Sequence, residues 1–397
     1  MAEIVTPSRV RLSVYTRIPA DPGRYFSEEE IRRSKAYQRP LTYLGMISAA
    51  ISLIVVVTFI WSQAGRRIID ALNMEAWPLQ IVVTMSSLLL VLMLSGIPVG
   101  LYRTFVHENK WGFNTQTPAG WVSDLIKSTI IGLVIANVVF LALWFVIRST
   151  DLWWLFGALL LTVFAVILVA IAPVVILPLF NKFEPAEDEQ LRDHLRTLAS
   201  AGGVSVSDVR VMDASKRTRH DNAFFTGLGK TKRLVIFDNM MGWERPLTDV
   251  VVAHEVGHWR HRHIVSSIFF GTLTTFLAFV ALKFVMEWDA ALGWAGASNV
   301  EDPVGISLFI LAFSTASLVT GLIDTWFSRA HERQADLFAL NLTRDPESFA
   351  RVWRQFSEKD LPDLAPSWLK RIRGTHPPIA ERLAMGESWT RSTVEAP

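Results

Sequence analysis

The chain has no cysteine and few charged residues. None of its 397 residues is Cys, and only 19% are Asp, Glu, Lys or Arg, whereas a soluble globular protein has about a quarter. The absence of Cys excludes disulfides, thiol catalysis and every zinc site built on thiolates. The net charge of +2 neither favours nor excludes nucleic acid binding. The uneven distribution of charge, however, excludes a soluble single-domain protein.

The missing charge is concentrated in six stretches without any Asp, Glu, Lys, Arg or His. Each has 19 or more residues, enough for a helix to cross roughly 30 Å of hydrocarbon. We therefore expect a mostly α, polytopic membrane protein with about six transmembrane helices. The six stretches are 41–65, 76–102, 128–147, 152–181, 264–282 and 303–323.

A long polar block, 182–263, separates the fourth and fifth of these stretches. Residues 184–200 predict an acidic helix, which a pair of glycines ends. The short segments 209–212 (Val-Arg-Val-Met) and 234–237 (Leu-Val-Ile-Phe) are predicted to be strands. Pro246 is then expected just inside the start of a new helix, where its missing N–H costs little. Together with the polar tail, this block is large enough for one small α+β catalytic domain.

The basic residues predict the orientation in the membrane. Residues 1–40 hold eight Lys and Arg, and cytoplasmic segments of membrane proteins carry an excess of these residues. If the N-terminus is cytoplasmic, both polar blocks and both termini face the cytoplasm, because the number of spans between them is even. The outside loops then carry only four basic residues: Arg66, Arg67, Arg148 and Lys283.

The sharpest chemical signal is His254-Glu255-Val256-Gly257-His258. On a helix, residues four apart share one face, so both imidazoles can bind the same Zn²⁺. Glu255 lies one step round the helix, where it can take a proton from a water on that metal. The sequence thus predicts one catalytic zinc ion, with His254 and His258 as ligands and Glu255 as general base.

A catalytic zinc needs a third protein ligand, which without Cys must be His, Asp or Glu. Glu332 is the candidate, because its segment directly continues the sixth apolar stretch and should be helical. Asp336 falls one turn later on the same face and can accept the second ring N–H of a zinc-bound histidine. Taken alone, however, this segment is also typical of an ordinary solvated end of a helix.

The two motifs together resemble the integral-membrane zinc metallopeptidases of the CAAX prenyl protease type 1 family. The similarity runs in order from about residue 25 to about residue 385. It rests on His-Glu-x-x-His at 254–258, Glu-Arg-Gln-Ala-Asp at 332–336, and the segments 109–118, 178–183, 222–225, 233–238, 376–378 and 381–383.

This resemblance implies roles that spacing alone does not assign. Glu332 would be the third zinc ligand, with Asp336 as the partner of a ligand. His376 would stabilise the oxyanion of the tetrahedral intermediate, as a second catalytic residue beside the general base. Asn222 and Ala223 would contact the bound peptide, which adds as a strand to a sheet edge. The catalytic domain would be zincin-like.

The sequence departs from the family in two places. Members of this type usually have seven membrane helices, and the polar segment 1–40 predicts that the first is absent. His331 and Arg333 flank Glu332 where the family often has aromatic residues, which predicts a wetter site or different peptides. The remaining histidines are expected to be structural or solvated and not ligands: His107, His194, His220, His261 and His263.

The predicted function is hydrolysis of peptide bonds in membrane-associated or lipid-modified, CAAX-like substrates near the cytoplasmic membrane face. Two alternatives stay open: a bacterial quality-control protease without a prenyl requirement, and a non-catalytic scaffold or transporter with structural zinc. The expected partners are a peptide or protein substrate and the lipid bilayer, and not nucleic acid. The expected location is a bacterial plasma membrane or, alternatively, the endoplasmic reticulum membrane.

The expected division of the chain has four parts. They are an N-terminal tail with four membrane helices (1–181), a catalytic segment with the His-Glu-x-x-His helix (182–263), two further membrane helices (264–327), and the third-ligand helix with the rest of the catalytic domain (328–397).

Overall fold

The computed structural model describes residues 20–226 and 232–394, so the first 19 residues of the basic N-terminal segment lie outside the described residues. The described part has six helical segments long and apolar enough to cross a membrane, which confirms the predicted number. They are α2 (Glu28–Trp61), α4 (Trp77–Leu101), α6 (Pro118–Ile147), α7 (Trp153–Ile171), α11 (His263–Met286) and α13 (Ile306–Thr343).

Two of these segments continue past a π-helical turn. After α4 comes η2 (Tyr102–Glu108) and then α5 (Asn109–Trp111), and after α7 comes η3 (Ala172–Ile176) and then α8 (Leu177–Phe180). Pro173 lies in η3, where its ring cannot support a regular α-helical hydrogen bond. The fourth span therefore passes through a π-helical turn near its end.

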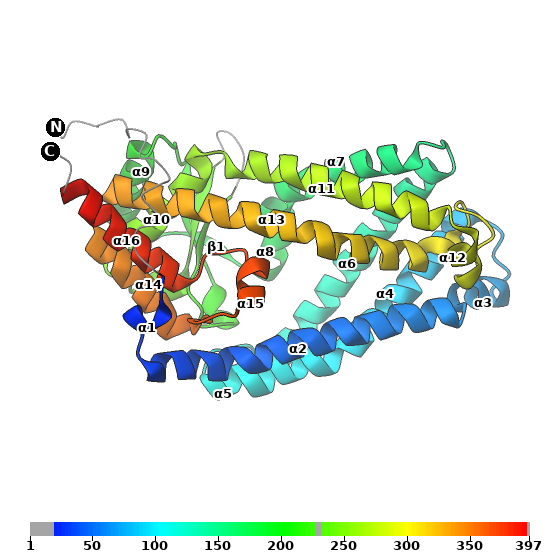
Figure 1. Cartoon of the computed structure of the whole chain (residues 1–397), viewed down its shortest axis with the longest axis horizontal. Helices are drawn as coiled ribbons and strands as arrows, with labels where there is room; N and C mark the ends of the chain where they lie inside the picture. The colour runs from blue at the N-terminus through cyan, green and yellow to red at the C-terminus, as the bar shows by residue number, and fades with distance from the viewer. Residues whose placement is uncertain (1–19, 227–231, 395–397) are drawn as a thin grey trace.

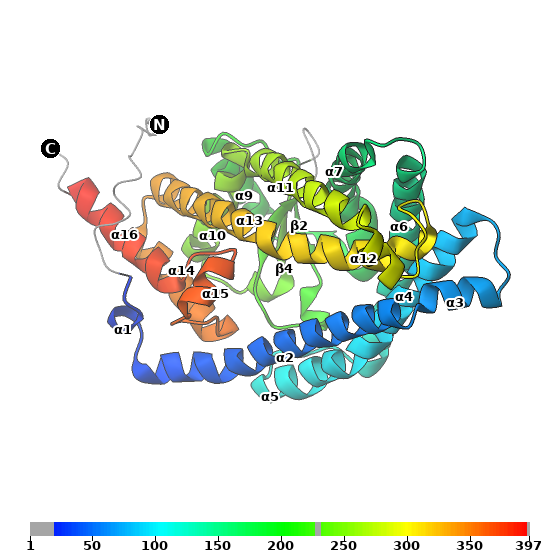
Figure 2. The same cartoon turned by 45° about the vertical axis from the view of Figure 1, so that its right-hand side comes forward.

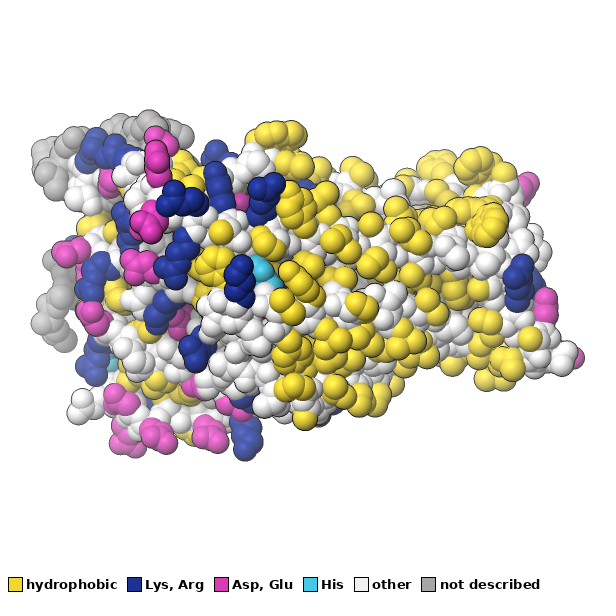
Figure 3. Space-filling view, turned by 90° about the horizontal axis from the view of Figure 1, so that it is seen from below, with side chains coloured by type: hydrophobic (Ala, Val, Ile, Leu, Met, Phe, Trp, Pro, Cys, Tyr) yellow, Lys and Arg dark blue, Asp and Glu magenta, His cyan; other side chains and the backbone are white. Residues whose placement is uncertain are grey.

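The long helices form one end of the molecule. The polar block 182–263 and the polar C-terminal part form the other, which we call the catalytic end after the predicted domain. In Figures 1 and 2, α2 runs along one side and α11 with α13 along the opposite side, while α1 and α16 lie at the catalytic end. Figure 3 shows hydrophobic side chains covering the helical end, while acidic and basic side chains gather at the catalytic end. This distribution fits a protein whose long helices are surrounded by lipid.

The catalytic end contains a four-stranded sheet in the order β1-β2-β4-β3. The predicted strands at 209–212 and 234–237 are β2 and β4, which pair in parallel, while β1 and β3 pair antiparallel with them. The strands are β1 (Phe183–Pro185), β2 (Asp208–Met212), β3 (Ala223–Thr226) and β4 (Arg233–Phe237).

The helix predicted over 184–200 begins later than expected. Its first residues belong to β1, and the helix α9 (Glu189–Ala201) starts only after Asp188, whose side chain accepts a hydrogen bond from the backbone N–H of Leu191. The predicted start is therefore wrong, because pairing with β2 and the Asp188 cap determine it.

Two hydrophobic clusters hold the catalytic end together. One joins α9, α10 (Arg245–Arg260) and the sheet; the other joins α10 to α1, α13, α14 and α16.

The remaining helices are α1 (Pro22–Tyr25), α3 (Ala64–Ala71), α12 (Asp289–Trp294), α14 (Pro346–Asp360), α15 (Trp368–Arg373) and α16 (Ile379–Val394), with the short η4 (Ala214–Lys216), η6 (Asp238–Met240) and η7 (Pro303–Gly305).

Helices α10 and α13 approach each other closely at Gly257. A Cβ atom at this position would lie 3.0 Å from both Cα of Ala335 and Cβ of Phe338, too close for ordinary van der Waals contact. Helix α13 is continuous from the membrane to the catalytic end, and the predicted division at 327/328 falls inside it. Glycine in α10 thus allows a membrane helix to reach the metal-binding motif.

Candidate active site

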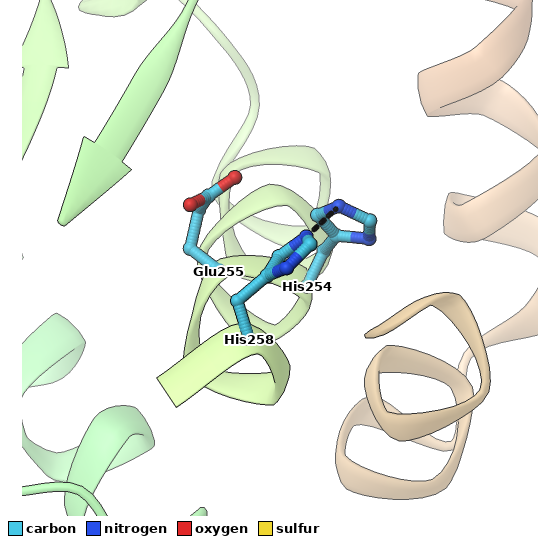
Figure 4. Close-up of side chains that lie close together, drawn as sticks. All are labelled: His254, Glu255 and His258. Atoms are coloured by element: carbon cyan, nitrogen blue, oxygen red, sulfur yellow. Dashed lines mark hydrogen bonds between the residues drawn. The ribbon is translucent and has the colours of Figure 1, made fainter. Parts of the chain in front are cut away.

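Helix α10 presents the first two candidate ligands. Pro246 lies in its first turn, as predicted. His254 and His258 lie one turn apart on the same face, and their Nε2 atoms are 3.1 Å apart. Figure 4 shows the two rings turned toward each other, while the carboxylate of Glu255 lies to one side.

Helix α13 brings the carboxylate of Glu332 to the same point. Its Oε1 lies 3.4 Å from Nε2 of His258, and its Oε2 lies 3.5 Å from Nε2 of His254. Tetrahedral zinc with bonds of about 2.0–2.2 Å places neighbouring ligand atoms roughly 3.3 Å apart. Two imidazoles and one carboxylate, a donor set that zinc enzymes use, therefore meet at a spacing that fits one metal ion.

The candidate ligands have buried, charged partners. Oδ1 of Asp336 lies 2.9 Å from Nδ1 of His254. Arg382, in α16, donates two hydrogen bonds of 2.7 Å to Asp336 and one of 3.1 Å to Glu332. Both Asp336 and Arg382 are buried. The guanidinium thus compensates two carboxylates that would otherwise repel each other in a region without water.

Sequence reasoning did not assign a role to Arg382. The residue lies 46 and 50 positions after its two partners, and no periodicity connects α16 to α13. The segment 381–383 contributed only to the family resemblance. Its guanidinium also lies 3.4 Å from the ring centroid of Trp353, which fixes it by a cation–π contact.

Glu255 lines a cavity of about 270 Å³ beside the candidate ligands. Its carboxylate and the ring nitrogens of His254 and His258 lie within 4.8 Å of one another, so it can act on a group that the histidines hold. Burial raises the pKa of Glu255, which makes it a stronger base than a solvated glutamate. The apolar side chains in the cavity wall are Phe224, Phe225, Trp259 and Ile264.

His376 reaches the site from the loop after α15. Its Nε2 lies 3.5 Å from Oε1 of Glu332, and 63% of its side chain is exposed. From α13, Arg329 donates to the carbonyl of Ile372 at the end of α15 at 2.8 Å and to a loop carbonyl at 2.6 Å, and Ser328 donates to a second loop carbonyl at 2.9 Å. The loop is thus held against the helix that carries Glu332.

The two residues predicted to bind substrate have different environments. Asn222 is exposed at the start of β3, and its carbonyl accepts a hydrogen bond from the N–H of Phe237. The side chain of Ala223 is buried in the cluster beneath the sheet, so only its backbone can contact a ligand. Strand β3 is the last in the sheet order.

The histidines predicted to be structural or solvated have varied surroundings. His194 lies 2.7 Å from Asp249, and His220 lies 2.6 Å from Asp360. His107 is buried, and His261 is exposed. His263 lies within hydrogen-bonding distance of the candidate ligand His258, a contact that the sequence did not indicate.

The fold and the site define the class of this protein. A set of membrane-spanning helices, a His-Glu-x-x-His helix and a glutamate from a second helix are the parts of an integral-membrane metallopeptidase. Comparison with family models agrees. Residues 10–182 match a model described as the CAAX prenyl protease N-terminal region with five membrane helices, and residues 185–390 match peptidase family M48.

Known proteins are similar over most of the chain. CAAX prenyl protease 1 of Saccharomyces cerevisiae is 32% identical over 72% of this chain and 67% of its own length, and a rice homologue is 28% identical over 90% and 87%. The crystal structure of S. mikatae Ste24p superposes with a TM-score of 0.81, at 28% identity, covering 94% of this chain and 92% of that one.

The chain belongs to the CAAX prenyl protease 1 group of peptidase family M48 and is therefore a metalloendopeptidase of membranes. These relatives come from a plant and from yeasts, which does not favour the bacterial alternatives for function and location. The matched N-terminal model has five membrane helices, whereas the described residues of that region contain four candidate spans.

Proposed function

We propose that this chain is a zinc endopeptidase in which His254, His258 and Glu332 hold one Zn²⁺. The observation that supports the proposal is that the two Nε2 atoms and the carboxylate oxygens of Glu332 lie 3.1–3.5 Å from one another. Three protein ligands leave one position for water, as in catalytic sites, whereas structural zinc is usually closed by four. Membership of a peptidase family also favours catalysis over a scaffold or a transporter.

Glu255 is proposed as the general base. When bound, zinc supplies a water whose pKa falls to about 7 and polarises the scissile carbonyl. Glu255 accepts the proton of the attacking water and passes it to the leaving amine. Its position beside both histidines and its raised pKa support this role.

His376 and Asp336 act on either side of the ligands in this proposal. His376 lies on the exposed side of Glu332, where its ring can donate a hydrogen bond to the oxyanion of the substrate. Asp336 lies on the buried side, where it holds Nδ1–H of His254 and leaves Nε2 for the metal. Arg382 keeps Asp336 and Glu332 charged and fixed.

The peptide substrate is proposed to bind along β3. This strand ends the sheet, so its outer edge can pair with an extended peptide. Asn222 is exposed at the start of the strand and can hydrogen-bond the peptide backbone, and Ala223 can contribute only its backbone. The cavity next to Glu255 then receives one substrate side chain.

The proposed substrates are membrane-associated proteins with lipid-modified, CAAX-like C-termini, cut at the cytoplasmic face. The names of the relatives support the substrate class. Charge supports the orientation, because the loops opposite the catalytic end carry only four basic residues, and cytoplasmic segments carry an excess of Lys and Arg.

Hydrolysis of a fluorogenic farnesylated CAAX peptide by the purified protein in lipid nanodiscs tests the proposal. We expect cleavage, its loss after treatment with a zinc chelator, and its recovery on adding Zn²⁺. A matched peptide without the farnesyl group tests the substrate class separately. Cleavage that survives complete metal removal would exclude the zinc mechanism, and equal rates for both peptides would exclude a prenyl requirement.

A further inference from the structure

His263 lies directly behind His258, away from the proposed metal position. The Nδ1 atoms of the two rings are 3.0 Å apart, and Nε2 of His263 lies 3.0 Å from Oε1 of Gln334. His263 is buried, with 5% of its surface exposed. Because Nε2 of His258 faces His254 and Glu332, both nitrogens of the His258 ring have partners.

A tight turn brings His263 to this place. Helix α10 ends at Arg260, and Arg262 adopts a left-handed conformation with φ of 54°. Helix α11 then begins with His263. Gln334 comes from α13, two residues after Glu332, so the helix that supplies the carboxylate ligand also supplies the partner of His263.

The hydrogen bonds that connect His258, His263 and Gln334 allow only one arrangement of protons when both imidazole rings are neutral. An amide oxygen can only accept, so Nε2 of His263 must donate to Gln334. Nδ1 of His263 then has a free lone pair and accepts from Nδ1–H of His258. Nε2 of His258 is consequently unprotonated, which is the state that a metal requires.

A stacked ring also holds the imidazole of His263 in place. The ring of His331 stacks on it with a centroid distance of 4.2 Å and an interplanar angle of 12°. Nε2 of His331 lies 3.0 Å from Oγ of Ser266, whose hydroxyl donates to the His263 carbonyl. His331, one of the two departures from the family pattern, therefore restrains His263 from turning away from His258.

We propose that His263 is a positioning residue that selects the metal-binding tautomer of His258, with Gln334 selecting the tautomer of His263. The inference rests on the proposed function, because it assumes that His258 is a zinc ligand. In this arrangement the two proposed histidine ligands have different partners. His254 faces the carboxylate of Asp336, whereas His258 faces a neutral imidazole whose proton position depends on an amide.

Two substitutions of His263 separate the hydrogen bond from the packing. His263→Phe keeps an aromatic ring against His331 but removes the acceptor, whereas His263→Asn keeps an acceptor oxygen near the position of Nδ1 and loses ring volume. We expect the zinc dissociation constant to rise about 10–100-fold in His263→Phe, the usual effect of losing the partner of a ligating histidine. In His263→Asn it should stay within about threefold of the wild-type value.

The measurement is competition between the full-length protein in nanodiscs and a fluorescent zinc chelator, repeated with Co²⁺ to record its visible absorption. The Co²⁺ spectrum should change in His263→Phe and resemble wild type in His263→Asn, because it reports ligand geometry. Unchanged zinc affinity in His263→Phe would overturn the proposal. So would an equal loss in both variants, since packing alone would then account for it.

A second pair covers the case in which His263→Phe does not fold. Gln334→Met removes the acceptor and frees the His263 tautomer, whereas Gln334→Glu keeps an acceptor at the same place. We expect weaker zinc binding in Gln334→Met and near wild-type binding in Gln334→Glu. Equal zinc affinity in the two variants would overturn the proposal that Gln334 selects the tautomer of His263. If the wild-type protein bound no zinc at all, the proposed function would fail, and the result would be distinct from these.

Discussion

Arg382 is the residue on which both buried carboxylates of the site depend. It donates three hydrogen bonds to Asp336 and Glu332 while only 4% of its surface is exposed. Removing one partner of a buried ionic group costs more than the group contributes when intact, because a charge is left without compensation. The site is therefore more sensitive to Arg382 than to an ion pair at the surface.

We predict that Arg382→Met lowers the free energy of unfolding of the metal-free protein by about 3–5 kcal/mol. Denaturant unfolding followed by the fluorescence of the 15 tryptophans measures it. Arg351→Met is the matched control, because Arg351 pairs with Glu244 at the surface, and it should leave the midpoint unchanged. Equal midpoints for the two variants would contradict the account of the buried network.

Glu255→Gln tests the general base. The amide is similar in size but cannot accept a proton, so we expect peptide hydrolysis to fall about 10²–10⁴-fold. Zinc content should stay at the wild-type level, because Glu255 is not a proposed ligand. Cleavage assays with metal analysis of the same sample check both. Hydrolysis near the wild-type rate would show that another residue takes the proton.

His220 gives stability a predicted pH dependence. Burial alone would lower its pKa, but a hydrogen bond to Asp360 and the nearby carboxylate of Glu108 raise the pKa to about 9, above the usual value of about 6.5. The protonated ring thus stabilises the folded state fully below about pH 6.5, and this contribution is lost as pH rises through about 9. Melting temperatures should fall over that interval more in wild type than in His220→Gln. Parallel curves would contradict the prediction.

At the scale of elements, the close approach of α10 and α13 determines where Glu332 lies. The approach depends on Gly257, since a Cβ there would lie 3.0 Å from atoms of α13. The glycine between the two histidines is therefore a requirement of packing and not only of the motif.

We predict that Gly257→Ala destabilises the protein by about 1–3 kcal/mol, the usual cost of overpacking. It should also weaken zinc binding, because α13 must move away from α10. Thermal unfolding and chelator competition measure the two effects. Gly271→Ala in α11 is the control, because nothing lies within 4 Å of its added methyl group. A Gly257→Ala protein with wild-type affinity would exclude this dependence.

The elements themselves were predictable to different degrees. Long apolar stretches without charge identified all six spans, because no other environment accommodates such helices. The strands β2 and β4 were predicted from short segments rich in Val, Ile and Phe. Strand β1 and the start of α9 did not, because a strand of three residues depends on its pairing with β2. Local sequence does not contain that information.

The site was predictable where one helix contains the signal. Spacing alone placed His254, Glu255 and His258 together, and helical continuity made Glu332 a candidate. Arg382 and His263 could not be found in this way. The first meets its partners from another helix, and the second depends on a left-handed residue at position 262. The role of His376 came only from the resemblance to the family.

At the scale of the whole molecule, the catalytic end and the opposite end must face different compartments. The chain has no Cys, so single cysteines can report the orientation directly. We predict that a membrane-impermeant maleimide labels Glu187→Cys in sealed microsomes, whose cytoplasmic face is outside, and labels Ser149→Cys only after permeabilisation, because residue 149 joins α6 to α7 at the far end. The reverse pattern would show that the catalytic end faces the lumen.

The central claim is that two helices hold one zinc ion between His254, His258 and Glu332. Anomalous X-ray scattering at the zinc absorption edge, from crystals of the purified protein, tests it most directly. We predict a single strong peak per chain, bounded by Nε2 of both histidines and the carboxylate of Glu332. A peak elsewhere, or none in protein that cleaves peptide, would contradict this account of the site.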